Sequence, residues 1–118
     1  MPIERLHRGP RMSQAVIHNK TVYLAGQVAA NARGKGVAEQ TREILATIDA
    51  LLKEAKSDKS RILSATIWLT SMAAFAEMNQ VWDQWVAPGA TPARATVESA
   101  QLASPEYKIE IAVIAAQA

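Results

Sequence analysis

Hydrophobic and polar positions alternate over several short segments of the chain, a pattern typical of β-strands. These segments are rich in β-branched and aromatic residues. They predict five strands, at residues 15–17, 21–25, 62–70, 94–100 and 107–116. A polar turn at residues 18–20 joins the first two strands, and Gly26 ends the second.

Two longer segments instead carry apolar residues at helical spacing. Residues 37–56 place Ile44, Leu45, Ile48, Leu51, Leu52 and Ala55 on one face, with charged residues on the other. Residues 73–86 form a second apolar stripe, which Phe75, Met78, Trp82, Trp85 and Val86 make up. Both patterns predict amphipathic helices that cover a core.

The predicted order is β-β-α-β-α-β-β, which indicates an α+β fold in one domain over residues 1–118. Two helices of this length are expected to pack on one face of a mixed sheet. The last strand is apolar on both faces, with Ile109 and Ile111 on one and Ala112 and Ile114 on the other. Since two helices cover only one face, we expect another copy of the chain to cover the second.

Composition excludes several classes of protein. Hydrophobic residues make up 49% of the 118 residues, and the net charge is only +2. Lys and Arg are scattered, which argues against a nucleic-acid surface. There is no cysteine, so disulfides and thiolate chemistry are excluded. The first residues lack the apolar core of a signal peptide, and no apolar run approaches membrane-spanning length. We therefore expect a soluble cytoplasmic protein.

Two charged residues stand inside segments that otherwise look like core strands. Arg94 shares its strand face with Thr96 and Glu98, and Glu110 interrupts a very apolar segment. A buried charge is costly without a partner. An arginine and a carboxylate that converge on a pocket would bind and process a small carboxylated molecule.

The chain resembles the RidA/YjgF family of enamine/imine deaminases, also called endoribonuclease L-PSP-like proteins. The resemblance runs along nearly the whole chain in order and spacing. Its landmarks are the strand 22–24 with Ala25-Gly26-Gln27, the helix segment 75–79, the signature Pro92-Ala93-Arg94-Ala95-Thr96-Val97-Glu98 and the run Lys108-Ile109-Glu110-Ile111.

The resemblance implies a chorismate-mutase-like fold assembled as a homotrimer around a central barrel, with active sites in the clefts between subunits. The implied activity is that of a hydrolase: reactive enamines or imines become 2-keto acids and ammonia. The implied partner is a small carboxylated imine, enamine or 2-keto acid. No metal or organic cofactor is implied.

The same resemblance assigns roles to individual residues. Arg94 matches the arginine that holds the substrate carboxylate, and Glu110 matches the acidic residue that moves protons or positions water. Asn79 and Gly26 match pocket positions, Gly26 through its backbone. Apart from the resemblance, the proposed chemistry leads us to expect that backbone groups near Gly26 and Ala95 contact the nitrogen end of the substrate.

Two pocket positions depart from the family archetype. Met12 stands where the archetype has a tyrosine, and Thr96 stands where it has a cysteine. A reaction in which water attacks does not need the thiol. The loss of the tyrosine alters the pocket wall, so we expect a divergent branch whose substrate differs from the archetypal one.

Other interpretations of these residues stay open. Arg94 could be a structural charge at a subunit interface, and Glu110 could pair with it or with Lys108. The chain could be a trimer that binds 2-keto acids without catalysis. Ribonuclease or translation-inhibitor activity lacks support, because no histidine pair and no basic aromatic surface is present. His7 and His18 lack metal-ligand spacing. The three tryptophans are expected in the core.

Overall fold

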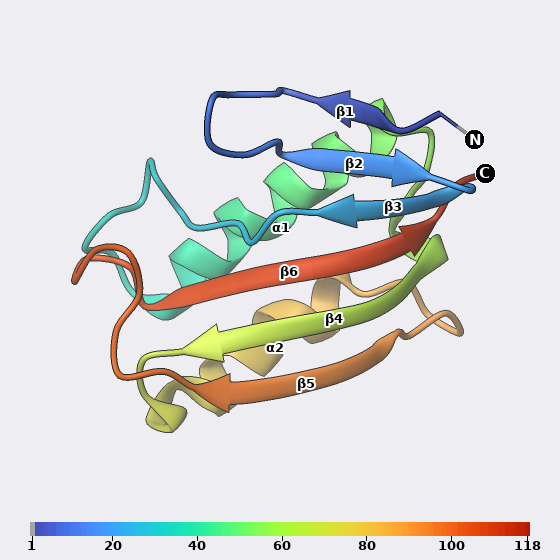
Figure 1. The fold of residues 1–118 in the computed structure, drawn as a ribbon. Coiled ribbons are helices and arrows are strands. Elements are labelled where there is room, and N and C mark those ends of the chain that lie inside the picture. The colour runs from blue at the N-terminus through green and yellow to red at the C-terminus, as the bar shows by residue number, and fades with distance from the viewer. Residues whose placement is uncertain (1) are drawn as a thin grey trace.

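The computed structural model describes residues 2–118 as one six-stranded sheet with helices packed against it (Figure 1). The sheet order is β1-β2-β3-β6-β4-β5. The strands are β1 (Glu4–Leu6), β2 (Ala15–His18), β3 (Thr21–Leu24), β4 (Ile62–Leu69), β5 (Ala93–Glu98) and β6 (Ile109–Ala116). The predicted α+β class and the placement of the segments are thereby confirmed.

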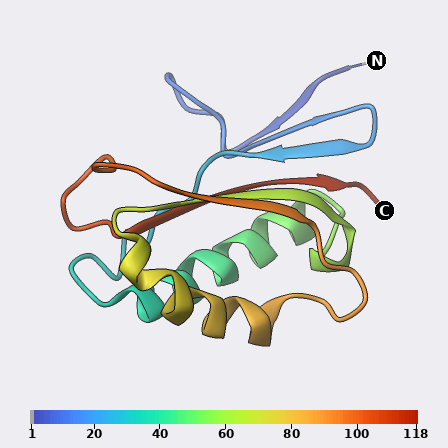
Figure 2. The same cartoon turned by 90° about the horizontal axis from the view of Figure 1, so that it is seen from below.

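Two α-helices lie on the same face of the sheet (Figure 2). They are α1 (Val37–Glu54) and α2 (Phe75–Trp85). Short 3-10 helices precede β4 and α2, namely η1 (Lys59–Arg61) and η2 (Met72–Ala74). The observed helices are slightly shorter than predicted, because the chain tightens into turns at their ends.

The sheet is mixed because β4 pairs in parallel with β5 and antiparallel with β6. A parallel pair needs a crossover, and α2 supplies it between β4 and β5. The remaining neighbours pair antiparallel, and β2 joins β3 through a tight turn at Asn19 and Lys20. Both turn residues have positive φ, at 50° and 59°. The strand β6, which is the last along the sequence, lies inside the sheet between β3 and β4.

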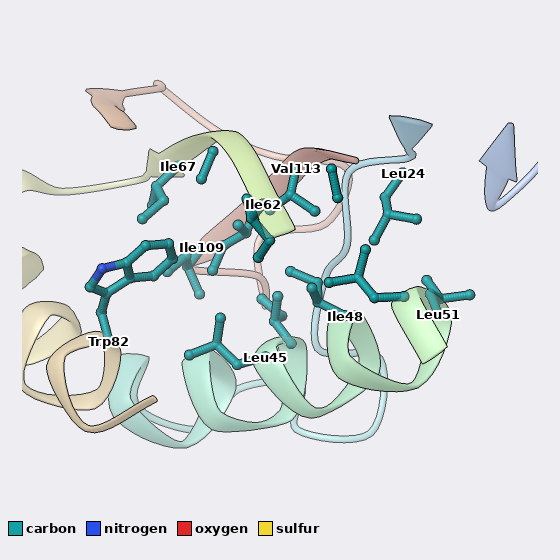
Figure 3. Packing of buried hydrophobic residues seen from close by; sticks show 14 of the residues in the cluster. Leu24, Leu45, Ile48, Leu51, Ile62, Ile67, Trp82, Ile109 and Val113 are labelled. Carbon is teal, nitrogen blue, oxygen red and sulfur yellow. The ribbon is translucent and has the colours of Figure 1, made fainter. Parts of the chain in front are cut away.

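The core lies between the helices and the sheet (Figure 3). The apolar stripe of α1 is buried, as its helical spacing predicted. Alternate residues of β6 complete the opposite wall: Ile109, Ile111 and Val113 are at most 1% exposed. Trp82 reaches into the same core from α2. The predicted inward face of β6 is correct.

The second face of the sheet carries no helix. Three of its apolar side chains are well exposed, Tyr23 at 45%, Val97 at 44% and Ile114 at 36%. Trp68 pairs in register with Glu110 on this face and is half-buried, so the prediction that all three tryptophans lie in the core is wrong for it. The sequence analysis expected another copy of the chain to cover this face, and the face is indeed apolar and uncovered within one chain.

The strand β1 was not predicted. It pairs antiparallel with β2 at the sheet edge, with Arg5 opposite Val16. Its residues Glu4, Arg5 and Leu6 contain a single apolar side chain, so no alternating pattern marks them. Charged residues at an edge strand also limit pairing with other chains. None of the helices among residues 2–118 combines the length and the apolar character needed to cross a membrane.

Candidate functional site

Arg94 lies on β5 and points toward α2, on the helix-bearing face of the sheet. Its register partner on β4 is the buried Ala65. The guanidinium carbon is 5.1 Å from the ring centroid of Trp82 and 5.8 Å from that of Phe75. Both separations are within the range of cation–π attraction. The two rings thus position a half-buried guanidinium without neutralising it.

No carboxylate pairs with Arg94 among residues 2–118. The ion pairs found there join His7 to Glu54 and Arg33 to Glu106. The nearby Glu98 has another role, because one of its carboxylate oxygens accepts a hydrogen bond of 2.8 Å from the backbone N–H of Met72. The planar fork of Arg94 therefore keeps its capacity to bind a carboxylate.

Two polar atoms on the same face lack partners. In the part of the chain that the structure describes, the side-chain oxygens of Asn79 and Thr96 are buried without a hydrogen bond. Asn79 lies on α2, one turn after Phe75, and Thr96 follows Arg94 by two residues along β5. A buried polar atom without a partner costs about 1–3 kcal/mol. We call Arg94, Asn79 and Thr96 the arginine cluster.

Glu110 lies on β6 and points to the opposite, uncovered face. Its neighbours Ile109 and Ile111 are buried on the helix side, and the strand alternates. Within residues 2–118, Glu110 has no cation partner. It is half-buried beside Trp68, its register partner on β4.

Gly26 makes room for the Glu110 carboxylate. A methyl group built on Gly26 would come within 2.0 Å of the Glu110 oxygen Oε2, closer than any real contact. Gly26 precedes Gln27, whose backbone exchanges hydrogen bonds of 2.8 and 3.1 Å with Ile111. Any larger residue at position 26 would therefore displace the carboxylate. Glu110 and Gly26 form a second group, which we call the carboxylate cluster.

The remaining predicted residues lie apart from these groups. Met12 belongs to the loop between β1 and β2 and is 49% exposed. Its loop is held by a 2.8 Å bond from Gly9 N–H to the Met12 carbonyl and by a 2.9 Å bond between the side chains of Gln27 and Gln14. Ala95 is exposed on the uncovered face, between Arg94 and Thr96.

Arg94 and Glu110 do not meet within one chain. They point from opposite faces of the sheet, and β4 separates their strands, which adds about 10 Å. The expected convergence of these two charges on one pocket therefore does not occur within a single chain. Any site that uses both must draw them from two copies of the chain.

Sequence reasoning missed the function of the aromatic residues beside Arg94. Trp82 was assigned to the core alone, although its ring also faces the guanidinium. The spacing of Phe75, Asn79 and Trp82 over two helical turns was the available signal, because it places all three on one side of α2. Among residues 2–118, no three His, Asp or Glu side chains gather closely enough to hold a metal ion.

Comparison with known proteins agrees with this fold. A family profile described as Endoribonuclease L-PSP matches residues 3–117. A solved structure of a YjgF-family protein from Neisseria meningitidis superposes with a TM-score of 0.95 at 47% identity, covering 100% of this chain and 97% of the other.

Two relatives illustrate the range of sequence identity. A RutC family protein from Haemophilus influenzae is 46% identical, with 98% of each chain covered. A bovine protein named 2-iminobutanoate/2-iminopropanoate deaminase is 34% identical, over 89% of this chain and 79% of its own. A profile match over nearly every residue, together with this level of identity, leads to one conclusion: the chain belongs to the endoribonuclease L-PSP family, which includes the RutC and YjgF proteins.

Proposed function

We propose that the protein hydrolyses reactive enamines or imines of 2-amino acids to 2-keto acids and ammonia. One observation carries the proposal: Arg94 is fixed by Trp82 and Phe75, yet has no carboxylate partner among residues 2–118. A guanidinium positioned and left unpaired in this way favours a carboxylate ligand. The family relationship indicates which carboxylates to consider, since the bovine relative is named as an iminobutanoate and iminopropanoate deaminase.

The active site would form between subunits of a homotrimer. The uncovered sheet face, with Tyr23, Val97 and Ile114 exposed, supplies an apolar surface that association would bury. A cyclic trimer repeats one heterologous contact three times. The arginine cluster of one subunit would then meet the carboxylate cluster of its neighbour at each contact.

The chemistry requires only binding and proton movement. Arg94 would hold the substrate carboxylate and orient the adjacent C=N carbon. Glu110 would accept a proton from water as the water oxygen bonds to that carbon. The same carboxyl group would return that proton to the nitrogen, which gives a carbinolamine. As the carbinolamine collapses, its hydroxyl proton would pass through Glu110 to the nitrogen while the C=O bond forms and the C–N bond breaks. Ammonia leaves and the 2-keto acid remains, so atoms and charges balance without a redox step.

The unpaired atoms of Asn79 and Thr96 support a polar ligand at this position. Each could hydrogen-bond to the substrate or to its water, which would satisfy groups that folding leaves without partners. Ala95 and Gly26 would contribute backbone contacts, and Met12 would line the pocket. Thr96 retains a hydroxyl where the archetype has a thiol, and the proposed attack by water needs neither.

A coupled assay tests the proposal. An amino-acid oxidase generates 2-imino acids from a panel of amino acids, and semicarbazide traps the imine that survives. We expect the protein to reduce trapping, and Arg94→Ala to abolish that effect. Arg61→Ala is the matched control, because Arg61 is exposed and its side chain hydrogen-bonds to the Gln117 carbonyl, away from Arg94.

A non-catalytic role in 2-keto acid binding uses the same arginine. Under that alternative the wild-type protein would bind 2-keto acids but would leave imine trapping unchanged for every amino acid tested. That outcome would overturn the proposed hydrolysis.

A further inference from the structure

The helix-bearing face carries a groove that the proposed reaction does not use. It is lined by residues of α1 and α2 and by Lys59 of η1, and has a volume of about 260 Å³. Leu45 and Val81 form part of its floor, and Trp85 forms a wall. A single water needs only about 30 Å³, so this hollow exceeds an ordinary packing defect. It approaches the lower end of ligand sites, about 300 Å³.

The aromatic wall of the groove is held in place. The indole N–H of Trp85 donates a 2.9 Å hydrogen bond to the Asp49 carboxylate on α1. The Lys59 ammonium lies 5.4 Å from the centroid of the Trp85 ring. Trp82 packs against Trp85 at a centroid distance of 5.3 Å, with the two ring planes tilted by 54°. A ring fixed by three neighbours offers a preformed surface to another planar group.

The charges along the groove are unequal. At the Trp85 end, Lys59 and Asp49 carry opposite charges that offset one another. Arg42 stands seven residues before Asp49 on α1, about 10 Å away along the helix axis. Arg42 is exposed and has no ion pair among residues 2–118. The unbalanced charge of the groove is therefore positive and lies at the Arg42 end.

From this arrangement we infer that the groove is a binding site for a small planar aromatic monocarboxylate. Its ring would lie along Leu45 and Val81 against Trp85, and its carboxylate would meet Arg42. A guanidinium suits this function because its fork matches a carboxylate in two places. The groove is on the helix side, so assembly through the uncovered sheet face would leave it accessible. The inference is independent of the proposed hydrolysis.

The probe for the test is 2-naphthoate, titrated into ¹⁵N-labelled protein. The indole N–H resonances are followed, and the Trp85 signal is assigned from its loss in Trp85→Phe. We expect a saturable shift of the Trp85 resonance. The neutral isostere 2-naphthamide should bind about tenfold more weakly or worse, because it lacks the charge that Arg42 recognises.

Three variants decide the matter. Arg42→Gln should weaken 2-naphthoate binding about tenfold. Lys53→Gln removes the same charge from an exposed position on the same helix and should change binding less than about twofold. Arg94→Ala should also leave it unchanged, which excludes a shift transmitted from the arginine cluster through Trp82. No saturable Trp85 shift, or equal affinity in Arg42→Gln with a native amide spectrum, would overturn the inference.

Discussion

Arg94 is a charged residue whose environment explains both its position and its availability. The aromatic rings of Trp82 and Phe75 attract the guanidinium, but unlike a carboxylate they occupy none of its N–H donors. A structural ion pair would instead have used those donors. The residue is therefore held in place and free to bind, which is the combination that substrate recognition requires.

The planar fork of Arg94 predicts a graded response to substitution. Arg94→Ala removes a charge-assisted contact in a partly dry cleft, so kcat/KM for 2-imino acids should fall by about 30-fold to several thousandfold. Arg94→Lys should recover only part of this loss, because an ammonium cannot bind both carboxylate oxygens in one plane. Steady-state kinetics of the three proteins provide the measurement. A lysine variant as active as wild type would show that the fork is not used.

We predict that Gly26→Ala lowers activity but leaves the fold intact. In Gly26→Ala the new methyl would occupy the position of the Glu110 carboxylate, and the flexible Glu110 side chain can move aside. A displaced catalytic group typically costs about 10- to 100-fold in rate. We expect kcat to fall by that factor while the unfolding temperature stays close to wild type.

The control for this variant is Gly36→Ala. Gly36 precedes α1 with φ of −68°, and nothing lies within 4 Å of an added methyl. It should leave kcat unchanged. Wild-type kcat in Gly26→Ala would remove Glu110 from the proposed mechanism, or require that its carboxylate acts from another position.

At the level of elements, Gln40 joins the loop that precedes α1 to the loop that precedes β6. It is fully buried on α1. Its side-chain N–H groups donate to the carbonyls of Lys35 and Glu106 at 3.1 and 2.9 Å. Its oxygen accepts a 2.9 Å bond from the Lys108 N–H. The side-chain amide of Gln40 thus links both loops to α1.

Gln40→Leu should destabilise the protein strongly. It removes three hydrogen bonds to the backbone and leaves the Lys35 carbonyl and the Lys108 N–H without these partners, at a cost of about 1–3 kcal/mol each if they stay buried, while the Glu106 carbonyl still accepts a 3.2 Å bond from the Gly34 N–H. We expect the free energy of unfolding in urea to fall by about 3 kcal/mol or more, and hydrogen exchange at Lys108 to accelerate. Gln80→Leu, an exposed change of the same kind on α2, is the control. A loss below about 0.5 kcal/mol in Gln40→Leu, the range of an ordinary surface change, would show that water replaces these bonds.

The elements differ in how well the sequence predicts them. Periodicity located α1, α2 and the five long strands because burial on one face is the main force behind each. It could not locate β1, whose pairing with β2 depends on backbone hydrogen bonds and not on an apolar pattern. Trp68 was misplaced because a hydrophobic residue does not reveal which face of a sheet it occupies. The bonds of Gln40 were equally hidden, since their partners lie 66 and 68 residues away.

The site was predictable as a set of residues but not as an arrangement. The signature around Arg94 and the isolated Glu110 singled out the candidate residues, whose part in a site stays a prediction. That the two charges point to opposite faces follows from sheet order and register, which single-sequence patterns do not determine. At the scale of the molecule, this geometry makes assembly part of the proposed activity.

The uncovered face predicts that a charge at its centre disrupts assembly. Ile114 is an apolar residue of this face on β6, the strand that lies inside the sheet. Ile114→Lys would bury an unpaired ammonium in a subunit contact, which costs several kcal/mol. Sedimentation should give a trimer for the wild type and a monomer for Ile114→Lys. Ala50→Lys, exposed on α1, should remain a trimer. A monomeric wild type at micromolar concentration would refute the assembly.

Subunit mixing tests the central proposal most directly, namely that Arg94 and Glu110 act across a subunit contact. Arg94→Ala and Glu110→Gln each remove one half of every site, so each homotrimer should be inactive. If the variants are unfolded together and refolded as an equal mixture, random mixing restores an intact pair at about a quarter of the contacts. We predict that imine hydrolysis returns to about a quarter of the wild-type rate. A mixture no more active than its parents, with trimers formed and subunits exchanged, would contradict the account.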